Sequence, residues 1–376
     1  MPRTLAPDAT TLSLRALNRA TLARQSLLER SDASAFDMVR HLSGMQAQAP
    51  FPPYFGLWSR LENFAPDDLS RLILDRSLVR ITLMRGTVHL ATAADAQLLR
   101  PLIQPTLNRL VQQNSQFRAS IAGLDLDELA MFSRKLLENE PQSMLQLREH
   151  LAARWPDRDP AGLSHATYYL LPLVQIPPRG IWGMSGQPVC TTLDAWVGAA
   201  PDDDPSIDDV VLRYLGAFGP ATVMDAQTWS GLTRLGAVFE RLRPQLVSFR
   251  DEDGRELFDL PESPRPDPET PAPARILAPF DNVLIGYKNR RRIMTEPHQK
   301  QIFTQNGIVQ SAALIDGFTV GTVATTRANG HATQTITLFE AISPRDRDEL
   351  VAEGERLLAF AEPDADRHAV EFSGPD

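Results

Sequence analysis

Two glutamines separated by one residue are the most informative chemical feature of the chain. Gln46 and Gln48 flank Ala47. Each glutamine side chain offers a carbonyl acceptor and an NH₂ donor, so the pair can hold one water molecule in a fixed orientation without carrying charge. Such neutral groups suit a hydrolysis in which the enzyme has to aim a nucleophile and needs no group with a tuned pKa.

Two longer motifs accompany the glutamines. Met84-Arg-Gly-Thr-Val-His-Leu90 follows them, and Phe280-Asp-Asn-Val-Leu-Ile-Gly-Tyr287 lies near the C-terminus. With these motifs in this order, the chain resembles the AlkZ-like winged-helix DNA glycosylases from about Leu12 to Phe360. The resemblance implies a monofunctional enzyme that hydrolyses N-glycosidic bonds in damaged double-stranded DNA and uses no metal or nucleotide cofactor.

The resemblance also implies roles for the glutamines. In the AlkZ-like family a Gln-x-Gln motif lies in a concave surface of tandem winged helices, and a related branch carries Asp in place of the second Gln. Gln46 and Gln48 are therefore the expected catalytic residues. They place the chain beside the branch that acts on bulky N7-guanine adducts and interstrand crosslinks, in repair or in self-resistance to a genotoxic natural product.

The lack of a carboxylate in the motif bears on the substrate. A neutral base leaves poorly as an anion, so enzymes that remove one usually supply a carboxylate and proton donors. An N7-alkylated purine already carries positive charge and departs neutral, so the enzyme has only to aim a water at C1′ and tolerate oxocarbenium character. The motif therefore favours cationic purine lesions over uracil or mismatched adenine.

The charge balance limits how the chain can meet DNA. A formal net charge of −9 argues against a protein that coats nucleic acid through its whole field. Acidic residues cluster in runs such as Asp202 to Asp204. The densest basic run is the candidate phosphate clamp, with a solvated loop as the alternative. Its members are Lys288, Arg290, Arg291 and Arg292.

Other classes of site have no support in the sequence. Cys190 is the single cysteine, and the seven histidines are scattered, so neither a disulfide nor a zinc or iron–sulfur site is expected. The first eleven residues contain no apolar signal segment, and no stretch approaches the ~18 apolar residues of a membrane span. We expect a monomeric, cytoplasmic, nucleoid-associated protein without contact to a membrane.

Proline marks the clearest boundary in the chain. Six prolines in thirteen residues, from Pro261 to Pro273, exclude helix and sheet and predict an extended linker over 261–274. Before it, helices followed by a short hairpin occur three times. We predict an α+β fold in which three tandem winged-helix motifs (helix-turn-helix plus β-hairpin) precede a small C-terminal β-rich domain. The expected units are 12–95, 96–200, 205–260 and 275–376.

The first hairpin carries further candidate residues. Alternation on both sides of Arg85-Gly86 predicts a two-residue turn that pairs position 83 with 88 and 82 with 89. The apolar residues then share one face, and the opposite face carries Arg80, Thr82, Thr87 and His89. Arg85, Thr87 and His89 are candidate contacts to DNA, with an ordinary exposed hairpin as the alternative. His89 could also act as a general base, since its ordinary pKa is about 6.5.

Patterns in the later segments predict the remaining elements. The second unit should hold helices over 125–138, 143–154 and 162–171 and a hairpin bracketed by 180–183 and 189–193. The third should hold a capping box from Thr222 to Asp225, a recognition helix over 233–242 and a wing turn at 251–254. Strands are expected at 275–285, 308–315, 319–325 and 334–339, followed by a helix over 344–361.

Alternatives remain for one residue and for the function. Trp182 is a candidate to stack on a base or wedge the duplex, or it covers core. The chain could also be a non-catalytic winged-helix transcriptional regulator, although its expected recognition helix offers only Arg234, Glu240 and Arg241 to read bases. An interaction scaffold with degenerate DNA-binding modules fits the acidic charge but leaves the glutamine pair unexplained.

Overall fold

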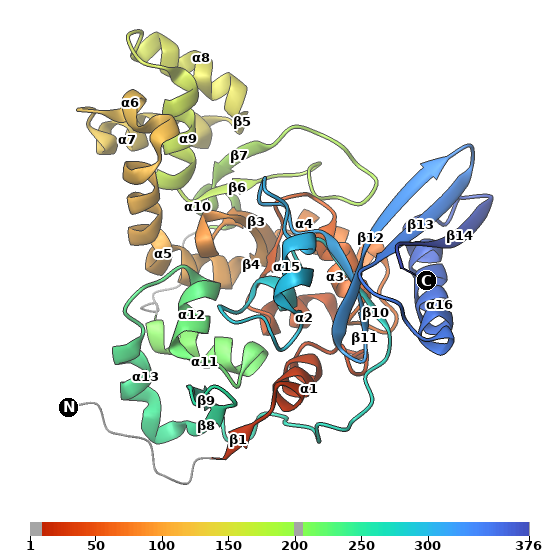
Figure 1. Ribbon diagram of the computed structural model, residues 1–376. Coiled ribbons are helices and arrows are strands. Elements are labelled where there is room, and N and C mark those ends of the chain that lie inside the picture. The colour runs from red at the N-terminus through yellow and green to blue at the C-terminus, as the bar shows by residue number, and fades with distance from the viewer. Residues whose placement is uncertain (1–9, 199–205, 376) are drawn as a thin grey trace.

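The computed structural model describes residues 10–198 and 206–375, and the acidic run Asp202 to Asp204 lies outside them. Helices and strands are mixed along the chain in an α+β fold (Figure 1). Within the described residues, no helix is both long and apolar enough to cross a membrane.

The N-terminal segment places short helices ahead of a hairpin, as the sequence predicts. Ser13 caps the first helix by accepting a hydrogen bond from the N–H of Ala16, and proline opens the third, where an N–H has no helical partner. The helices are α1 (Leu14–Arg24), α2 (Ala35–His41), α3 (Pro52–Trp58) and α4 (Pro66–Leu74). The strands are β1 (Thr11–Leu12), β2 (Met45–Gln46), β3 (Leu78–Thr82) and β4 (Val88–Thr92), with a 3₁₀ turn η1 (Met84–Gly86) between the last two.

The predicted register of the β3–β4 hairpin is wrong by one residue. Thr82 pairs with Val88 and Ile81 with His89, because the loop holds one residue more than a two-residue turn. The N–H of Leu83 closes this loop on the carbonyl of Thr87 at 3.0 Å. A slip of one residue exchanges side chains between faces. His89 therefore shares its face with Ile81 and not with Arg80 and Thr82.

The expectation of an exposed polar face also fails, because both faces of the hairpin are covered. Every residue of β3 and β4 is buried. Val79 and Ile81 pack into one hydrophobic cluster, whereas Leu78 and Leu90 pack into another. A hairpin enclosed in this way can keep polar side chains only where each finds a hydrogen-bond partner.

The second unit shares a sheet with the first. Because β3 pairs with β6 as well as with β4, the two hairpins form one six-stranded sheet in the order β2-β4-β3-β6-β7-β5. The hairpin of this unit begins at Leu173, upstream of the expected 180–183. The strands are β5 (Gln142–Ser143), β6 (Leu173–Gln175) and β7 (Val189–Thr192). The helices are α5 (Ala93–Gln113), α6 (Ser115–Ile121), α7 (Leu126–Asn139), α8 (Met144–Arg154), α9 (Pro160–Leu170) and α10 (Leu193–Val197).

The third unit follows the predicted order of elements. The capping box is present, since Thr222 accepts from the N–H of Asp225 and the Asp225 carboxylate accepts from the N–H of Thr222. Its hairpin extends into a three-stranded sheet through parallel pairing with β1. The helices are α11 (Ile207–Phe218), α12 (Val223–Ser230), α13 (Gly236–Leu242) and the 3₁₀ turn η2 (Arg243–Gln245). The strands are β8 (Val247–Asp251) and β9 (Glu256–Asp259).

The C-terminal segment is β-rich, as expected, and its closing helix has the predicted bounds. The stretch expected to be one strand over 275–285 divides into a strand and a short helix, and the last strand, β14, is not predicted. The strands form a five-stranded sheet of β10 (Arg275–Leu277), β11 (Ser311–Ile315), β12 (Phe318–Ala328), β13 (His331–Leu338) and β14 (Arg367–Ser373). The helices are α14 (Asn282–Ile285), α15 (Glu296–Ile302) and α16 (Pro344–Ala361).

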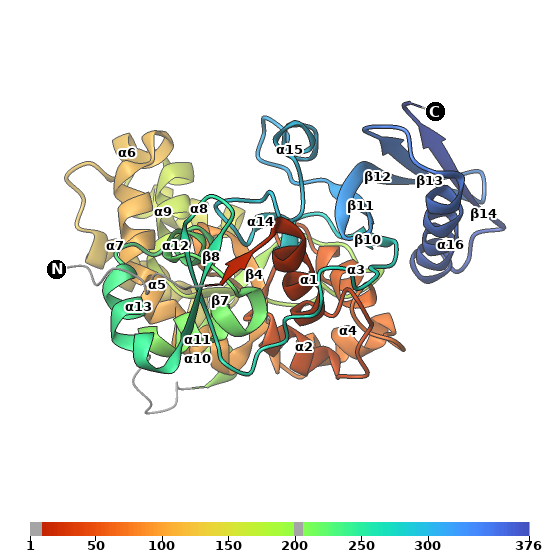
Figure 2. The ribbon, with the colours of Figure 1, turned by 60° about the horizontal axis from the view of Figure 1, so that its bottom comes forward.

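The proline-rich linker is ordered against α1. Arg15 donates to the carbonyl of Pro268 at 2.7 Å, and Arg24 donates to that of Pro264 at 3.3 Å. Arg24 also forms a two-point ion pair with Asp259 at 2.7 and 2.8 Å, with both side chains almost fully buried. The linker leads to the C-terminal sheet and α16, which lie at the opposite end of the molecule from α6 to α9 (Figure 2).

We predict that this buried ion pair is needed for stability. Asp259→Asn leaves the Arg24 guanidinium buried without a counter-charge, so the free energy of unfolding should fall by about 3 kcal/mol or more. The exposed pair Asp208–Arg241 is the control, and Asp208→Asn should cost less than about 1 kcal/mol. Urea unfolding compares the two variants, and equal losses would contradict this account.

Candidate active site

A short edge strand presents the two glutamines. Gln46 lies opposite His89 in the β2–β4 ladder, and the N–H of Ala47 continues that ladder to the carbonyl of Val88 at 2.7 Å. The strand β2 ends at Gln46, and Ala47 directly beyond it enters the core, where it is 0 % exposed. Gln46 is 9 % exposed and Gln48 is exposed, so the pair spans the edge between core and solvent.

The hairpin orients both amides. Arg85 donates from Nη2 to Oε1 of Gln46 at 2.9 Å, and the main-chain N–H of Val88 donates to Oε1 of Gln48 at 3.2 Å. Each amide oxygen has two lone pairs, so each keeps one acceptor site in addition to its NH₂ donors. Two amides fixed in this way can accept from and donate to a water molecule between them.

Arg85 is a cation beside the glutamines without a carboxylate partner in the described structure. It occupies a left-handed conformation, with φ at 58°, in the turn between β3 and β4. Its Nη1 donates to the carbonyl of Trp229, in the last turn of α12, where a cation is favoured. Burial first, and then the charge of Arg290, lowers the pKa of Arg85 to about 10, so the side chain stays protonated at neutral pH.

His89 is a neutral acceptor in this site. Its Nδ1 lies 2.9 Å from the carbonyl of Thr87, so Nδ1 carries the proton, and Nε2 accepts from Nη2 of Arg85 at 3.3 Å. Burial, followed by the charge of Arg85, lowers the pKa of His89 to about 3 despite the hydrogen bond to Thr87. Nε2 of His89 already accepts a hydrogen bond from Arg85, and the side chain is only 1 % exposed. His89 is therefore unsuited to act as a general base or to contact DNA directly.

The third sequence motif anchors the glutamine strand. Asn282 donates from Nδ2 to the carbonyl of Gly44 at 2.9 Å, just before β2 begins. The adjacent Asp281 accepts two bonds of 2.8 Å from Arg60, and both side chains are buried. These positioning residues were not among the predicted site residues, although they lie inside a motif that the sequence had singled out. Sequence spacing could not show that this motif meets the chain at Gly44.

The four residues of the predicted basic run differ in solvent exposure. Lys288 and Arg291 are exposed, and Arg291 forms an ion pair with Asp253 at 3.1 Å. Arg290 is half-buried over the ring of Phe303 and donates to a main-chain carbonyl. Arg292 is 4 % exposed and donates to the carbonyl of Pro220. The prediction that Arg292 contacts DNA is therefore not supported, because its side chain is buried and its Nη1 is bonded to a main-chain carbonyl.

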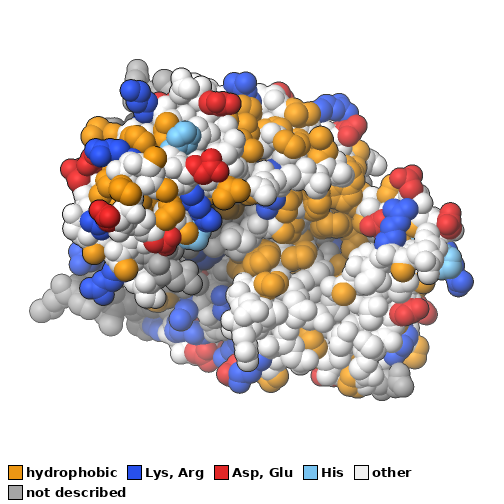
Figure 3. Space-filling view, turned by 90° about the horizontal axis from the view of Figure 1, so that it is seen from above, with side chains coloured by type: hydrophobic (Ala, Val, Ile, Leu, Met, Phe, Trp, Pro, Cys, Tyr) orange, Lys and Arg blue, Asp and Glu red, His pale blue; other side chains and the backbone are white. Residues whose placement is uncertain are grey.

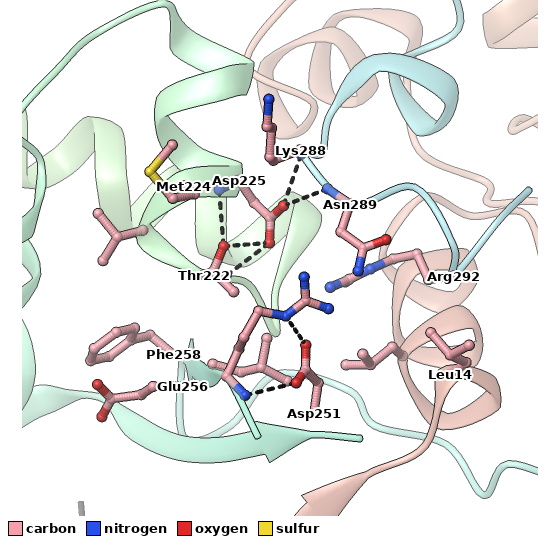
Figure 4. Close-up of a pocket in the computed structure, with 14 residues that line it drawn as sticks. Leu14, Thr222, Met224, Asp225, Asp251, Glu256, Phe258, Lys288, Asn289 and Arg292 are labelled. Carbon is pink, nitrogen blue, oxygen red and sulfur yellow. Dashed lines mark hydrogen bonds and ion pairs between the residues drawn. The ribbon is translucent and has the colours of Figure 1, made fainter. Parts of the chain in front are cut away.

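A cavity of about 430 Å³ lies beside this run (Figure 4). The main-chain N–H groups of Lys288 and Asn289 donate to Asp225 at its edge, while the Lys288 amine points away from that carboxylate. The cavity meets the first residues of α12, whereas Trp229, which contacts Arg85, lies near the end of that helix. An eight-residue helix is roughly 12 Å long. The cavity is thus separate from the glutamine pair.

The remaining candidates, Thr87 and Trp182, are alike in accessibility. Thr87 is half-buried, and its hydroxyl donates to the carbonyl of Met84. Trp182 is half-buried within an aromatic cluster, with its ring centroid 4.9 Å from that of Tyr54 and 5.5 Å from that of Phe360. These contacts agree with the core alternative for Trp182, because its ring joins the second unit to α16.

The molecular surface offers no broad basic patch on the face seen from above. Apolar side chains gather in its hollowed middle, and basic and acidic side chains are interspersed around them (Figure 3). This distribution fits the acidic net charge and leaves any attraction to phosphate to a few individual cations.

The chain is similar to known proteins in both sequence and structure. A family model described as DNA glycosylase AlkZ-like matches residues 39–360. An interstrand DNA cross-link repair glycosylase from Streptomyces sahachiroi is 29% identical over 329 residues, which cover 80% of this chain and 84% of that protein. The solved structure of the S. sahachiroi DNA glycosylase AlkZ aligns with a TM-score of 0.80 at 21% identity, and the alignment covers 96% of this chain and 100% of that one. The last match shows a shared fold.

The low pKa of His89 predicts an acid-sensitive contribution to stability. Between about pH 6.5 and pH 3 the unfolded chain binds a proton at this position that the folded protein does not, so stability is retained above this window and lost as the pH falls through it. From pH 7.5 to pH 5 the wild type should lose about 2 kcal/mol more than His89→Asn, whose amide can replace the bond to Thr87. Urea unfolding at both pH values measures this difference. Equal losses would show that His89 titrates normally.

Proposed function

The chain belongs to the AlkZ-like DNA glycosylase family, enzymes that act on N-glycosyl bonds, and we propose that it hydrolyses the N-glycosidic bond of cationic N7-alkylated purines in DNA. The proposal depends on one observation above all. Gln46 and Gln48 are oriented by the β3–β4 hairpin, and among the described residues the groups that hydrogen-bond to their amides are a guanidinium and a main-chain N–H, not a carboxylic acid. Such a site can aim water but has no acid beside the glutamines that could protonate a leaving base at neutral pH.

The proposed reaction assigns each group a defined task. Gln46 and Gln48 hold a water whose oxygen forms the new bond to C1′ of the damaged nucleotide. The bond from C1′ to the purine nitrogen breaks, and its electron pair neutralises the positive charge of the N7-alkylated base, which leaves without needing a proton. The attacking water releases its proton to solvent. His89 takes no part in the proton transfer, because Arg85 occupies its free nitrogen.

Arg85 has one proposed contribution and imposes one constraint. It fixes the Gln46 amide through its hydrogen bond to Oε1. Its positive charge disfavours a cationic base that approaches closely. We therefore place the lesion base on the solvent side of the exposed Gln48, away from Arg85.

Bulky adducts and interstrand crosslinks are the substrates that we propose by analogy. A relative with 29% identity is named as an interstrand cross-link repair glycosylase. A crosslinked base is tethered to both strands, which makes its full extrusion into a closed pocket difficult. An exposed second glutamine just beyond an edge strand suits attack on such a base in place. Repair or self-resistance to a genotoxic natural product is the corresponding proposed role.

Winged-helix modules provide the proposed DNA-binding framework. The tandem arrangement and its boundaries at 12–95, 96–200 and 205–260 remain our interpretation. Phosphate contacts are proposed for Lys288 and Arg291, which are exposed, and for Arg290 and Thr87, which are half-buried. A transcriptional regulator is less well supported, because Arg241 at the end of α13 is paired with Asp208 and does not extend freely toward base edges.

The glutamine pair gives the sharpest prediction for this function. Gln46→Ala and Gln48→Ala should each slow base release from N7-methylguanine DNA by about tenfold or more and leave DNA affinity nearly unchanged, since neutral amides contribute little to phosphate attraction. The double variant should cost little more than the slower single variant if the two amides act as one unit. Gln48→Asp should retain some activity, because a carboxylate can also accept from the water.

Single-turnover excision with enzyme in excess measures these rates, and Gln97→Ala on α5 is the matched control. The substrate panel contains N7-methylated, bulky N7-adducted and crosslinked duplexes together with a uracil duplex. Wild-type rates in both alanine variants would refute the catalytic assignment. Faster release of uracil than of N7-methylguanine would refute the proposed preference for cationic bases.

Exposed cations should determine the salt dependence of DNA binding. Replacing Lys288 and Arg291 together by Ala should reduce the slope of log affinity against log salt by about 0.9 for each phosphate that the variant no longer neutralises. Arg345→Ala on α16, where the side chain is exposed and forms an ion pair with Glu349, should leave the slope unchanged. Equal slopes for the wild type and the double variant would remove these residues from the DNA-binding surface.

A further inference from the structure

A second arginine holds the glutamine strand from the opposite side. Arg80 lies in β3, is 1 % exposed, and has no carboxylate partner among the described residues. Its Nη2 donates to the carbonyl of Ala47 at 2.9 Å and to Oε1 of Gln175 at 3.3 Å, and its Nη1 lies 3.4 Å from the carbonyl of Pro50. Two of these three acceptors are main-chain groups at and just beyond the glutamine motif.

The burial of Arg80 at this position destabilises the folded protein. Burial lowers its pKa to about 10, so the guanidinium stays charged at neutral pH. Its Nε has no hydrogen-bond partner although it is buried. A buried charge without a counter-charge destabilises a fold. A destabilising group of this kind is often retained for function, and here it holds the main chain of the glutamine motif.

The six-stranded sheet fixes the Arg80 side chain. β3 pairs with both β4 and β6, and Gln175 of β6 is the direct cross-strand neighbour of Arg80. Gly180, with φ at +95°, packs against the arginine stem, where an added Cβ would lie 2.6 Å from Cδ of Arg80. Gln175 in turn donates to the hydroxyl of Tyr168 at 2.8 Å. The second unit thus supplies the groups that hold this arginine under the first unit's motif.

The contact lies where the glutamine strand leaves the sheet. The N–H of Ala47 makes the last ladder bond, to Val88, and the carbonyl of Ala47 is held by Arg80. Gln48 follows directly, and its own strand pairing has ended. The bond from Arg80 therefore fixes the peptide that joins Ala47 to Gln48, and with it the direction in which the Gln48 side chain leaves the main chain.

We infer that Arg80 is a positioning residue for the proposed reaction: by holding the carbonyl of Ala47, it sets the relative placement of the Gln46 and Gln48 amides without touching DNA. The inference rests on the proposed function of that pair. It assigns the fusion of the two hairpins into one sheet a specific task, which is to place a guanidinium from β3, braced by Gln175 and Gly180 of the second unit, beneath the motif.

Arg100 provides a matched control. It is 3 % exposed, donates to the main-chain carbonyls of Tyr169 and Leu171, and likewise lacks a carboxylate partner among the described residues. Burial lowers its pKa to about 10 as well. Arg100 lies on α5, and none of its described contacts is with the glutamine motif. A loss of activity caused only by removal of a buried arginine should therefore affect both positions equally.

The experiment compares Arg80→Met and Arg100→Met in single-turnover excision from N7-methylguanine DNA, with DNA affinity measured on the same duplex and thermal unfolding measured for both. We expect Arg80→Met to slow excision by about ten- to a hundredfold, the range that a small misplacement of catalytic groups produces, with affinity within about twofold of the wild type. Arg100→Met should destabilise the protein comparably and keep the excision rate within about twofold. Equal effects of the two substitutions on excision would overturn the inference.

A double-mutant cycle separates positioning from a general structural role. If Arg80 acts through the glutamines, Arg80→Met should slow excision little further in the Gln46→Ala/Gln48→Ala background, whereas a structural effect should add its full factor. Arg80→Lys keeps the charge and the stem but loses the planar fork, and it replaces Arg80→Met in both comparisons if that variant does not fold. A wild type that releases no base would refute the proposed function itself. An active wild type with an equally active Arg80 variant would refute only the positioning role.

Discussion

The pairing of one very short strand with β4 governs the geometry of the candidate active site. The ladder bonds of Met45 and Gln46, extended by the N–H of Ala47, place two amides at the edge of a sheet whose faces are both covered. A two-residue strand is too short to be stable alone. Its position depends on Asn282 before it, Arg80 after it and the β3–β4 hairpin beside it. Two distant parts of the sequence, the β3–β4 hairpin with Arg80 and the start of α14, therefore meet at the glutamines.

The charge pattern around the glutamines is unusual for a site that would accept a cationic base. Arg80 and Arg85 are both cations without carboxylate partners in the described structure, and they approach the motif from its two sides. Their hydrogen bonds go to the amide oxygens of Gln46 and Gln175, to Nε2 of His89 and to main-chain carbonyls, all neutral acceptors that serve orientation more directly than attraction. An acidic protein with exposed cations such as Lys288 should bind DNA with an affinity that salt weakens readily.

Local chemistry made much of the fold predictable. The capping box at Thr222 and the bounds of α16 follow from neighbouring residues, and the structure matches both. The helix α5 was missed because Pro101 and Pro105 argue against a helix interior. Both prolines are exposed, so the carbonyls that lose their partners can reach water. The buried residues on its other face, spaced by four, were the available signal: Leu99, Ile103, Leu107 and Val111.

Features that depend on contacts between distant segments could not be predicted from the sequence pattern. The register of the β3–β4 hairpin depends on Arg85 adopting a left-handed conformation, which is rare for a residue other than glycine and is not visible as a spacing. Alternation predicted exposure for His89, yet the helices of the third unit cover that face of the hairpin. The glutamine pair was predicted from residue chemistry and resemblance. The partners Arg80 and Asn282 required knowledge of which segments meet.

The central claim is that Gln46 and Gln48 jointly hold the attacking water. Its most direct test is a high-resolution crystal structure of the protein bound to duplex DNA in which a cationic pyrrolidine analogue of the sugar replaces the damaged nucleotide. The account predicts one ordered water within about 3.2 Å of an amide atom of each glutamine and facing the ring atom that stands for C1′. Glutamine side chains turned away from that atom, or a carboxylate in the place of the water, would contradict it.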